Sequence, residues 1–155
     1  MLMVGRYALY EDVVTNKTLA ERYRQYMIQH LGFDAEKMVP VEEAYQMHDQ
    51  SGSSCAPPSI LKTLQELSAD YENRDFGSCS YITPGIQAMF EIKATDLPHS
   101  IGFRDAAEGE YAHVEALRAG KANALLGLDV LLNPVFAARM KAEFRNAMEK
   151  AGRLQ

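Results

Sequence analysis

The feature that most constrains the fold is the helical spacing of apolar residues through the last third of the chain. Over residues 106–132 this spacing predicts one long helix, with an inner stripe that comprises Val114, Leu117, Leu125, Leu128 and Leu132. Asn133-Pro134 then starts a second helix, because asparagine caps a helix and proline suits its first position. The apolar stripe of this second helix comprises Phe136, Met140, Phe144 and Met148. Gly120 and Gly127 lower the helix propensity of the long helix predicted over residues 106–132, and each permits a close neighbour.

The N-terminal part of the chain combines short apolar runs with helical patterns. Residues 3–14 are apolar and aromatic and favour one or two short strands. Thr15-Asn16 then offers a cap for a helix that ends near Gly32 and whose apolar residues are Leu19, Tyr23, Tyr26, Met27 and Leu31. After a loop over residues 51–58, Ser59 caps a further expected helix that carries Ile60, Leu64, Leu67 and Tyr71.

Residues 80–92 carry the pattern of a half-buried strand. Ile86, Ala88, Phe90 and Ile92 alternate with Gln87, Met89 and Glu91, after a break at Thr83-Pro84-Gly85. The resulting order of strands and helices favours a layered α/β fold with two long C-terminal helices that cover one face of a sheet.

Length, charge and cysteine content narrow the class of protein. A chain of 155 residues predicts a single domain over residues 1–155. The net charge of −5 builds no basic field, so we expect no nucleic-acid partner. The chain has no apolar run long enough for a signal peptide or a membrane span, and its two cysteines form no CxxC pair. We therefore expect a soluble cytoplasmic protein without a membrane partner.

Most of the histidines fit ordinary structural positions. His30 falls in the last turn of the first expected helix, where a cation is favoured. His113 lies on the long helix without the acidic partner of an HExxH motif, and indicates a surface or boundary position. His48 follows the Glu42-Glu43 pair in a polar stretch that is more typical of a solvated loop than of a metal site.

His99 is the strongest candidate for a functional side chain. It follows a proline in a loop between the expected strand and the long helix, where α/β proteins place functional residues. Asp75, on an expected turn before that strand, is its most plausible companion. The sequence contains no GxSxG, P-loop, GxGxxG or HExxH motif, and Ser53, Ser54 and Cys55 have no recognisable base nearby.

Two longer segments resemble a known group of enzymes. The first is the run from Asp75-Phe76-Gly77-Ser78-Cys79 to Gln87, followed by Leu97-Pro98-His99-Ser100. The second is Ala124-Leu125-Leu126-Gly127-Leu128-Asp129-Val130-Leu131-Leu132-Asn133-Pro134. Together they resemble the C-terminal part of the zinc-dependent amidohydrolase and metallopeptidase superfamily of aminoacylase and glutamate carboxypeptidase. The branch they resemble contains p-aminobenzoyl-glutamate hydrolase and β-alanyl-lysine-type dipeptidases. The resemblance covers most of the chain, but residues 33–70 match poorly.

The resemblance implies a partial three-layer sheet-and-helix domain that corresponds to the C-terminal half of a zinc exopeptidase catalytic domain. It makes His99 a zinc ligand and Asp75 a residue that shapes the site. The family's other zinc ligands, its general base and its lid domain lie in segments that have no counterpart here, and Asn73-Arg74, Cys79 and Gln87 depart from the family pattern. A catalytic zinc needs about three protein ligands, so zinc is expected only together with a complementary N-terminal half.

Three hypotheses follow. The first is a truncated or split zinc amidohydrolase that is inactive alone and whose parent activity is amide hydrolysis of N-acyl amino acids or dipeptides. The second is a non-catalytic interaction module that forms a homo-oligomer through the surface left by the missing half, by strand edges or the long helices. The third is a small-molecule binder that uses the loop at residues 51–54.

Overall fold

The structure is a computed structural model, and it describes residues 13–38, 75–96 and 100–153. Several expected elements lie outside these residues. They are residues 3–12 of the strand region predicted over residues 3–14, the loop at 51–58 and the helix that follows Ser59. Residues 13 and 14 are described and form no strand. Within the described residues, no helix combines the length and the apolar character that a membrane crossing requires.

The first described helix, α1 (Lys17–Gln25), confirms the helix predicted after Asn16. The Asn16 side chain accepts a hydrogen bond from the backbone N–H of Leu19 at 3.1 Å, as an N-cap does. The helix continues into a π-helical turn, η1 (Tyr26–His30), and a short 3₁₀ turn, η2 (Ala35–Lys37), follows. Gly32 has a φ of 65°, a conformation that glycine adopts without strain, and the helical path ends there as predicted.

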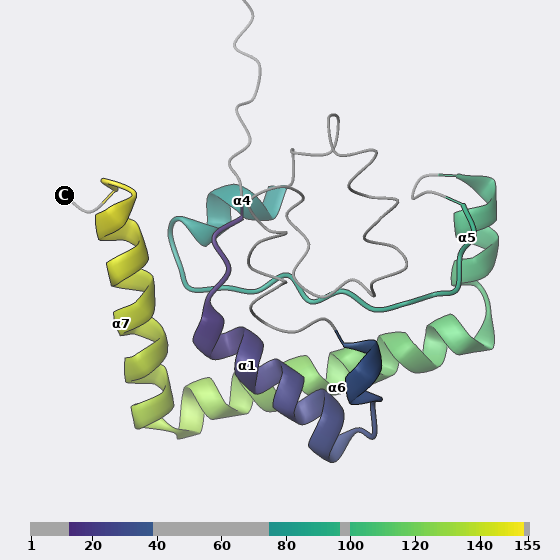
Figure 1. Cartoon of the computed structure of the whole chain (residues 1–155), viewed down its shortest axis with the longest axis horizontal. Coiled ribbons are helices and arrows are strands. Elements are labelled where there is room, and N and C mark those ends of the chain that lie inside the picture. The colour runs from purple at the N-terminus through teal and green to yellow at the C-terminus, as the bar shows by residue number, and fades with distance from the viewer. Residues whose placement is uncertain (1–12, 39–74, 97–99, 154–155) are drawn as a thin grey trace, which may run out of the picture.

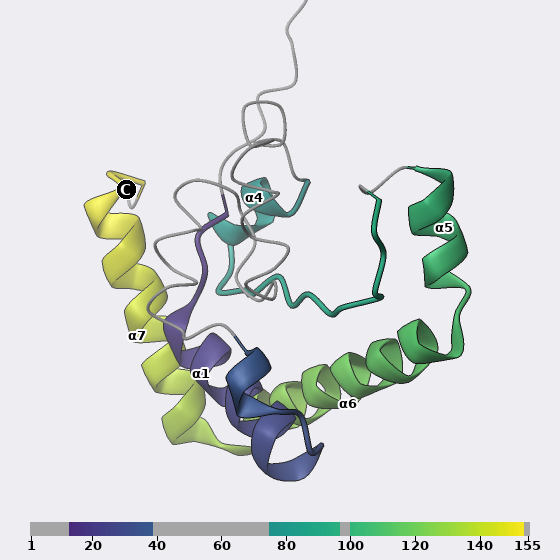
Figure 2. The same cartoon turned by 45° about the vertical axis from the view of Figure 1, so that its right-hand side comes forward.

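The two long C-terminal helices are also confirmed. They are α6 (Glu110–Leu132) and α7 (Pro134–Lys150), and the shorter helices α4 (Asp75–Ser80) and α5 (Ile101–Ala107) precede them. Asn133 caps α7 by accepting a hydrogen bond from the N–H of Phe136 at 3.0 Å. Figures 1 and 2 show α6 along the lower edge of the described fold, with α5 and α7 rising from its two ends on the same side.

The core lies where α1, α6 and α7 meet. It buries seven side chains: Leu19, Tyr23, Met27, Ala122, Leu126, Phe136 and Met140. Small residues on α6 let the bulkier side chains of α1 and α7 approach it closely. The stripe predicted for α1 points into this core, and so do Phe136 and Met140 of the stripe predicted for α7. Met148 is buried outside this cluster, and Phe144 is half-buried.

A second set of contacts joins the start of α1 to α7. Asn16 donates from its side-chain amide to the carbonyl of Met140 at 3.0 Å. The Glu143 carboxylate accepts hydrogen bonds from the backbone N–H groups of Lys17 and Thr18, and from the Thr18 hydroxyl at 2.7 Å. A carboxylate from one helix thus caps the positive end of another, which favours this pairing of α1 with α7.

The stripe predicted to be the inner face of α6 is wrong. Leu117 and Leu128 are each 51 % exposed, and Val114 and Leu132 are exposed as well. The buried face instead comprises Ala112, Glu115, Ala119, Ala122 and Leu126. The larger apolar residues mark the inner face only when the neighbouring helix leaves room for them, and here the close approach of α1 favours alanines.

The predicted α/β class is also wrong, since the described part of the chain contains helices and no strand. Residues 84–96 run from α4 toward α5 as an irregular extended segment, which Figure 1 shows in teal. The described residues contain one ladder contact, an isolated parallel bridge between Thr15 and Gly85. A strand needs backbone partners along its length. Ile86 and Ala88 pack against the core, but Phe90 is exposed and the residues between them are half-buried, so the burial of this segment does not follow the alternation of the sequence.

Gly85 is the point where this extended segment is held against the rest of the fold. Its carbonyl accepts a hydrogen bond from the N–H of Asn16 at 2.9 Å. The ring of Phe76 packs so closely that a Cβ on Gly85 would lie 2.6 Å from it. Nearby, Ser80 accepts from the N–H of Val14 at 2.8 Å and donates to the carbonyl of Gly77. A side chain at position 85 would therefore force the Phe76 ring to shift.

Candidate functional site

The two residues singled out from the sequence have different outcomes. His99 lies outside the described residues, so its role as a metal ligand stays a prediction. Asp75 is the first residue of α4, so it stands on a helix and not on the predicted turn before a strand. Residues 75–96 therefore form a helix followed by an irregular extended segment, in place of the strand that was expected before His99.

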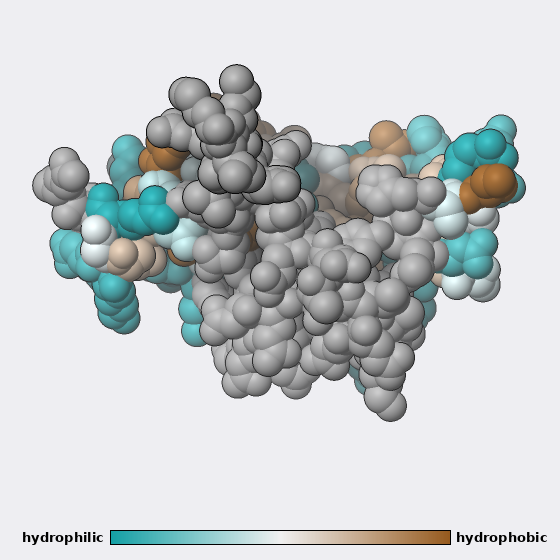
Figure 3. Space-filling model, turned by 90° about the horizontal axis from the view of Figure 1, so that it is seen from above, coloured by the Kyte–Doolittle hydropathy of each residue, from teal (hydrophilic) through white to brown (hydrophobic). Residues whose placement is uncertain are grey.

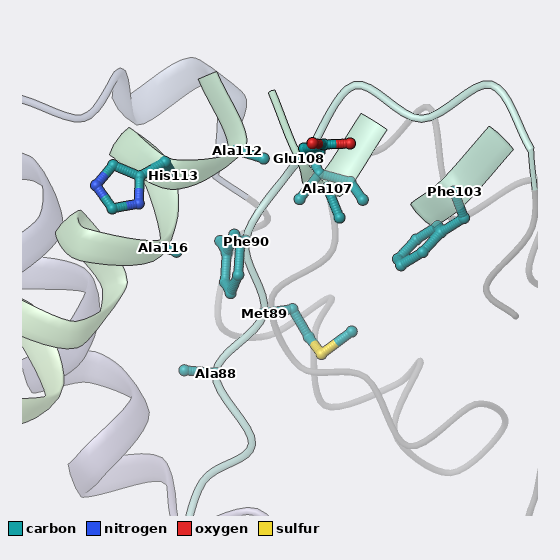
Figure 4. A pocket seen from close by; sticks show the side chains of 10 residues that line it. Ala88, Met89, Phe90, Phe103, Ala107, Glu108, Ala112, His113 and Ala116 are labelled. Atoms are coloured by element: carbon teal, nitrogen blue, oxygen red, sulfur yellow. The ribbon is translucent and has the colours of Figure 1, made fainter. Parts of the chain in front are cut away.

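A pocket of about 490 Å³ lies between the extended segment, α5 and α6. Ten residues line it: Ala88, Met89, Phe90, Ile92, Phe103, Ala107, Glu108, Ala112, His113 and Ala116. Figure 4 shows Met89 and Phe103 facing one another across the pocket, with the Phe90 ring beside α6. The lining is mostly apolar, which suits an apolar group more than a charged one.

The polar groups of this pocket lie at its edge. In Figure 4 the imidazole of His113 lies on the side of α6 away from Met89 and Phe103. Glu108, in the short link between α5 and α6, contributes the one carboxylate among the lining residues. No hydrogen bond or ion pair links Glu108 to His113 among the contacts of the described residues, so the pocket offers a binding surface without an acid–base pair.

Next to the pocket, a polar contact fixes the extended segment to α6. The hydroxyl of Tyr111 donates to the Glu91 carboxylate at 2.8 Å, and the Lys93 ammonium lies 3.8 Å from the centre of the Tyr111 ring. Desolvation and the hydrogen bond to Glu91 raise the pKa of Tyr111 to about 12. Tyr111 therefore stays protonated at neutral pH and acts as a hydrogen-bond donor.

A second polar cluster ties α1 to α6. Asp129 accepts a hydrogen bond from the hydroxyl of Tyr26 and forms an ion pair with Arg22 at 2.9 Å. The hydrogen bond to Asp129 raises the pKa of Tyr26, with desolvation as a further cause. Arg22 also lies over the ring of Phe136, 5.2 Å from its centre. These residues have structural partners on every side, which indicates a role in holding the helices together.

Sequence reasoning did not identify the pocket-lining residues as a site. It placed Met89 and Phe90 on opposite faces of a strand, whereas both line the pocket because this backbone is not a strand. The apolar character of residues 86–92 was the available signal. His30 and His113 are exposed, in line with their expected structural positions, and Glu42, Glu43 and His48 lie outside the described residues.

The metal expectation has no support in the described residues. Across residues 13–38, 75–96 and 100–153, no three histidine, cysteine, aspartate or glutamate side chains are grouped closely enough to hold an ion. These residues therefore do not fit a zinc site by themselves, and we derive no catalytic step through a metal.

The chain is similar to dipeptide-cleaving enzymes. It is 27% identical over 141 residues to the Xaa-Arg dipeptidase of Mus musculus, a match that covers 91% of this chain and 27% of that protein. It is 32% identical over 117 residues to the Xaa-Arg dipeptidase of Homo sapiens, with 76% of this chain and 27% of that protein covered. No protein-family model and no solved structure matches the chain.

These matches bear on the family resemblance at a coarse level. They support homology to a peptidase of the amidohydrolase superfamily, without distinguishing the branch of p-aminobenzoyl-glutamate hydrolase from others. The chain spans about a quarter of the length of the curated relatives that it matches.

Proposed function

We propose that this chain forms one part of a dipeptidase-like enzyme that cleaves the amide bond of a dipeptide or N-acyl amino acid. The observation that carries the proposal is the 32% identity to human Xaa-Arg dipeptidase over 117 residues. Because the chain corresponds to about a quarter of that protein, the remaining parts of the active site come from polypeptide outside the matched region. Alone, the chain has no hydrolytic activity in this proposal.

Within the proposed enzyme, His99 is one zinc ligand and Asp75 shapes the site around it. His99 stands four residues before Phe103, which lines the apolar pocket, and the segment from Ala88 to Ile92 lines the opposite side. The pocket is therefore close in sequence to the proposed ligand. In this proposal the pocket holds an apolar side chain of the substrate, such as that of the first residue of the dipeptide.

The test combines this chain with the part of human Xaa-Arg dipeptidase that has no counterpart in it. The assay follows zinc-dependent release of arginine from dipeptides that end in arginine. We expect no release by either polypeptide alone and measurable release by the mixture. The human protein's own matching region, added in place of this chain, is the positive control that shows the two-piece assay works.

Two variants decide the role of His99 in the same assay. His99→Ala is expected to lower arginine release by at least about 100-fold. Loss of a group that only hydrogen-bonds to a metal ligand costs about 10–100-fold, and loss of the ligand itself costs more. His30→Ala, at an exposed position on η1, is expected to leave release unchanged. If the positive control works while this chain gives no release, the hydrolytic proposal is wrong. If His99→Ala and the unaltered chain release arginine equally, His99 is not part of the site.

The alternative function is a non-catalytic interaction module. It is favoured by large apolar side chains that remain at the surface of α6 and the start of α7, where Leu131 is 79 % exposed and Val135 78 %. Exposed apolar residues that gather on one surface are typical of interaction sites. An inactive two-piece mixture together with stable self-association would support this alternative over hydrolysis.

A further inference from the structure

The pocket between the extended segment, α5 and α6 has an apolar interior. Its volume of about 490 Å³ lies within the range of sites that take small molecules. Met89, Phe90 and Phe103 supply its large side chains, and the alanines of α5 and α6 leave open the space between them. Phe90 is 42 % exposed, so its ring presents apolar surface that a ligand can cover. The interior therefore suits a large apolar group such as an aromatic ring.

One charged group stands at the edge of this interior, the carboxylate of Glu108. The backbone N–H of Glu108 donates to the carbonyl of Arg104 at 3.2 Å, which holds residue 108 at the C-terminal end of α5. In the part of the chain that the structure describes, no hydrogen bond or ion pair engages the Glu108 carboxylate. Figure 4 shows this carboxylate beside Ala107, above Phe90 and Met89 in that view. A ligand that fills the pocket therefore meets a free carboxylate at its edge.

The cations of the neighbouring segments already have partners. Arg104 donates two hydrogen bonds to Asp105, at 2.9 and 2.7 Å. The Lys93 ammonium lies over the Tyr111 ring. Residues 88–96 and 100–113 carry these two basic residues and five acidic ones, a formal charge of −3 with histidine neutral. The acidic residues are Glu91, Asp96, Asp105, Glu108 and Glu110. The surroundings of the pocket therefore attract a cation.

Apolar and polar surface lie side by side at this end of the molecule. Figure 3 shows brown hydrophobic and teal hydrophilic areas next to one another at the right-hand end, where Figure 1 places α5. A ligand that matches both characters has an apolar body and a positively charged group close to it. In a peptide, an N-terminal residue with a large apolar side chain has this form, because its α-ammonium group is only two bonds from the side chain.

From these features we propose that the pocket binds the N-terminal residue of a peptide, with a large apolar side chain inside and the α-ammonium group beside Glu108. The assignment of this residue as part of a substrate rests on the proposed hydrolytic function, which it narrows to dipeptides with a free amino terminus. An N-acyl amino acid carries a neutral amide in place of the ammonium group and leaves the Glu108 carboxylate without a partner. Glu108 thus contributes to the choice of substrate and not to the cleavage of the amide bond.

Binding is measured first on the full chain alone. The ligand is L-phenylalaninamide, and N-acetyl-L-phenylalaninamide is the matched ligand that keeps the ring and lacks the charge. The chain has eight methionines, whose ¹³C-labelled methyl groups report by NMR where a ligand binds. We expect the Met89 signal, assigned with Met89→Leu, to shift with a Kd on the order of 1–10 mM, as suits a ligand of about 12 non-hydrogen atoms. The signals of the buried Met140 and Met148 are expected not to shift.

Three variants separate the roles of charge and space. Glu108→Gln is expected to weaken binding of L-phenylalaninamide by about 3- to 5-fold, the range of an exposed ion pair, and to leave binding of the acetylated ligand unchanged. Glu110→Gln, at an exposed position outside the lining, is the matched control and is expected to change either Kd by less than about 1.5-fold, because solvent and salt screen its charge. Ala116→Leu fills the pocket and is expected to abolish the Met89 shift with both ligands.

The outcomes distinguish the pocket from the hydrolytic proposal. Equal binding of the two ligands, equal effects of Glu108→Gln and Glu110→Gln, or no shift of the Met89 signal would each overturn the assignment of the pocket. In the two-piece assay, Glu108→Gln is expected to raise the KM for phenylalanyl-arginine by the same factor as the Kd, and not the KM for its N-acetylated form. Selective binding by a chain that releases no arginine in that assay supports the binding site and overturns the hydrolytic proposal. Arginine release without selective binding does the reverse.

Discussion

Two regions of the protein are held in different ways. The helical core, formed by α1, α6 and α7, joins buried apolar side chains to hydrogen bonds in which one helix caps another. The arm, formed by residues 81–96 and α5, lies against the core through half-buried apolar residues and a few polar contacts such as that of Tyr111 with Glu91. A cap between helices fixes their geometry, whereas a segment with half-buried apolar residues and few hydrogen bonds to the core can open locally.

The largest expected difference between the two regions comes from the same substitution made in each. Phe136→Ala removes a ring that is 5 % exposed in the helical core and is expected to lower the free energy of unfolding by about 3–5 kcal/mol. Phe90→Ala removes a ring of the arm that is 42 % exposed and is expected to cost about 1 kcal/mol or less. Urea unfolding followed by circular dichroism measures both. Equal losses would show that the arm is as tightly packed as the core.

The next prediction concerns the carboxylate that caps α1 from α7. Glu143→Gln weakens its hydrogen bonds to the N–H groups of Lys17 and Thr18, and is expected to lower the free energy of unfolding by about 1–2 kcal/mol. Glu149→Gln, an exposed position on the same helix, is the control and is expected to change it by less than about 0.5 kcal/mol. The same urea titration measures both variants. If Glu143→Gln lowers the free energy of unfolding no more than the control does, this cap does not stabilise the core.

A third prediction compares helix caps in the two regions. Asn133→Ala removes the cap of α7 and is expected to cost about 1 kcal/mol in global unfolding. Ser100 accepts from the N–H of Phe103 at 3.1 Å and caps α5 in the same way. Because α5 belongs to the arm, Ser100→Ala is expected to speed hydrogen exchange within α5 while leaving global unfolding nearly unchanged. If Ser100→Ala lowers the free energy of global unfolding as much as Asn133→Ala does, α5 belongs to the core.

The smallest expected effect is the titration of Tyr111. Its pKa is raised to about 12 in the folded protein, so the stability that its hydrogen bond contributes is present below pH 10 and is lost as the pH rises through about 12. The chain has eight tyrosines, and its ultraviolet titration should contain a late component that ionises near pH 12. Tyr111→Phe is expected to remove this component. If the late component persists unchanged, the contact of Tyr111 with Glu91 does not hold the arm to α6.

The sequence predicted the helices of the core because their signals are local. Asn16 and Asn133 cap the helices they precede, Gly32 ends one, and Pro134 begins another, and each acts within a few residues. The buried stripes of α1 and α7 followed from spacing alone. Such signals need no knowledge of the partner element.

Features that depend on distant partners could not be predicted in this way. The alternation at residues 86–92 indicated a strand, but these residues make no ladder contact with the described backbone, and the one bridge lies just before them at Gly85. On α6, size alone favoured Leu117 and Leu128 as buried residues, whereas the close approach of α1 selects alanines such as Ala122. The pocket depends on how the arm crosses α6, and the role of His99 rests on the family resemblance.

Hydrogen exchange of the unaltered chain, measured residue by residue, tests the difference between the two regions most directly. Amides of α1, α6 and α7 are expected to exchange only through global unfolding. Amides of residues 84–96 and of α5 are expected to exchange through local opening, at rates at least about 100-fold faster. Protection of residues 86–92 equal to that of α6 would contradict this division, and it would show that the segment is paired in a sheet.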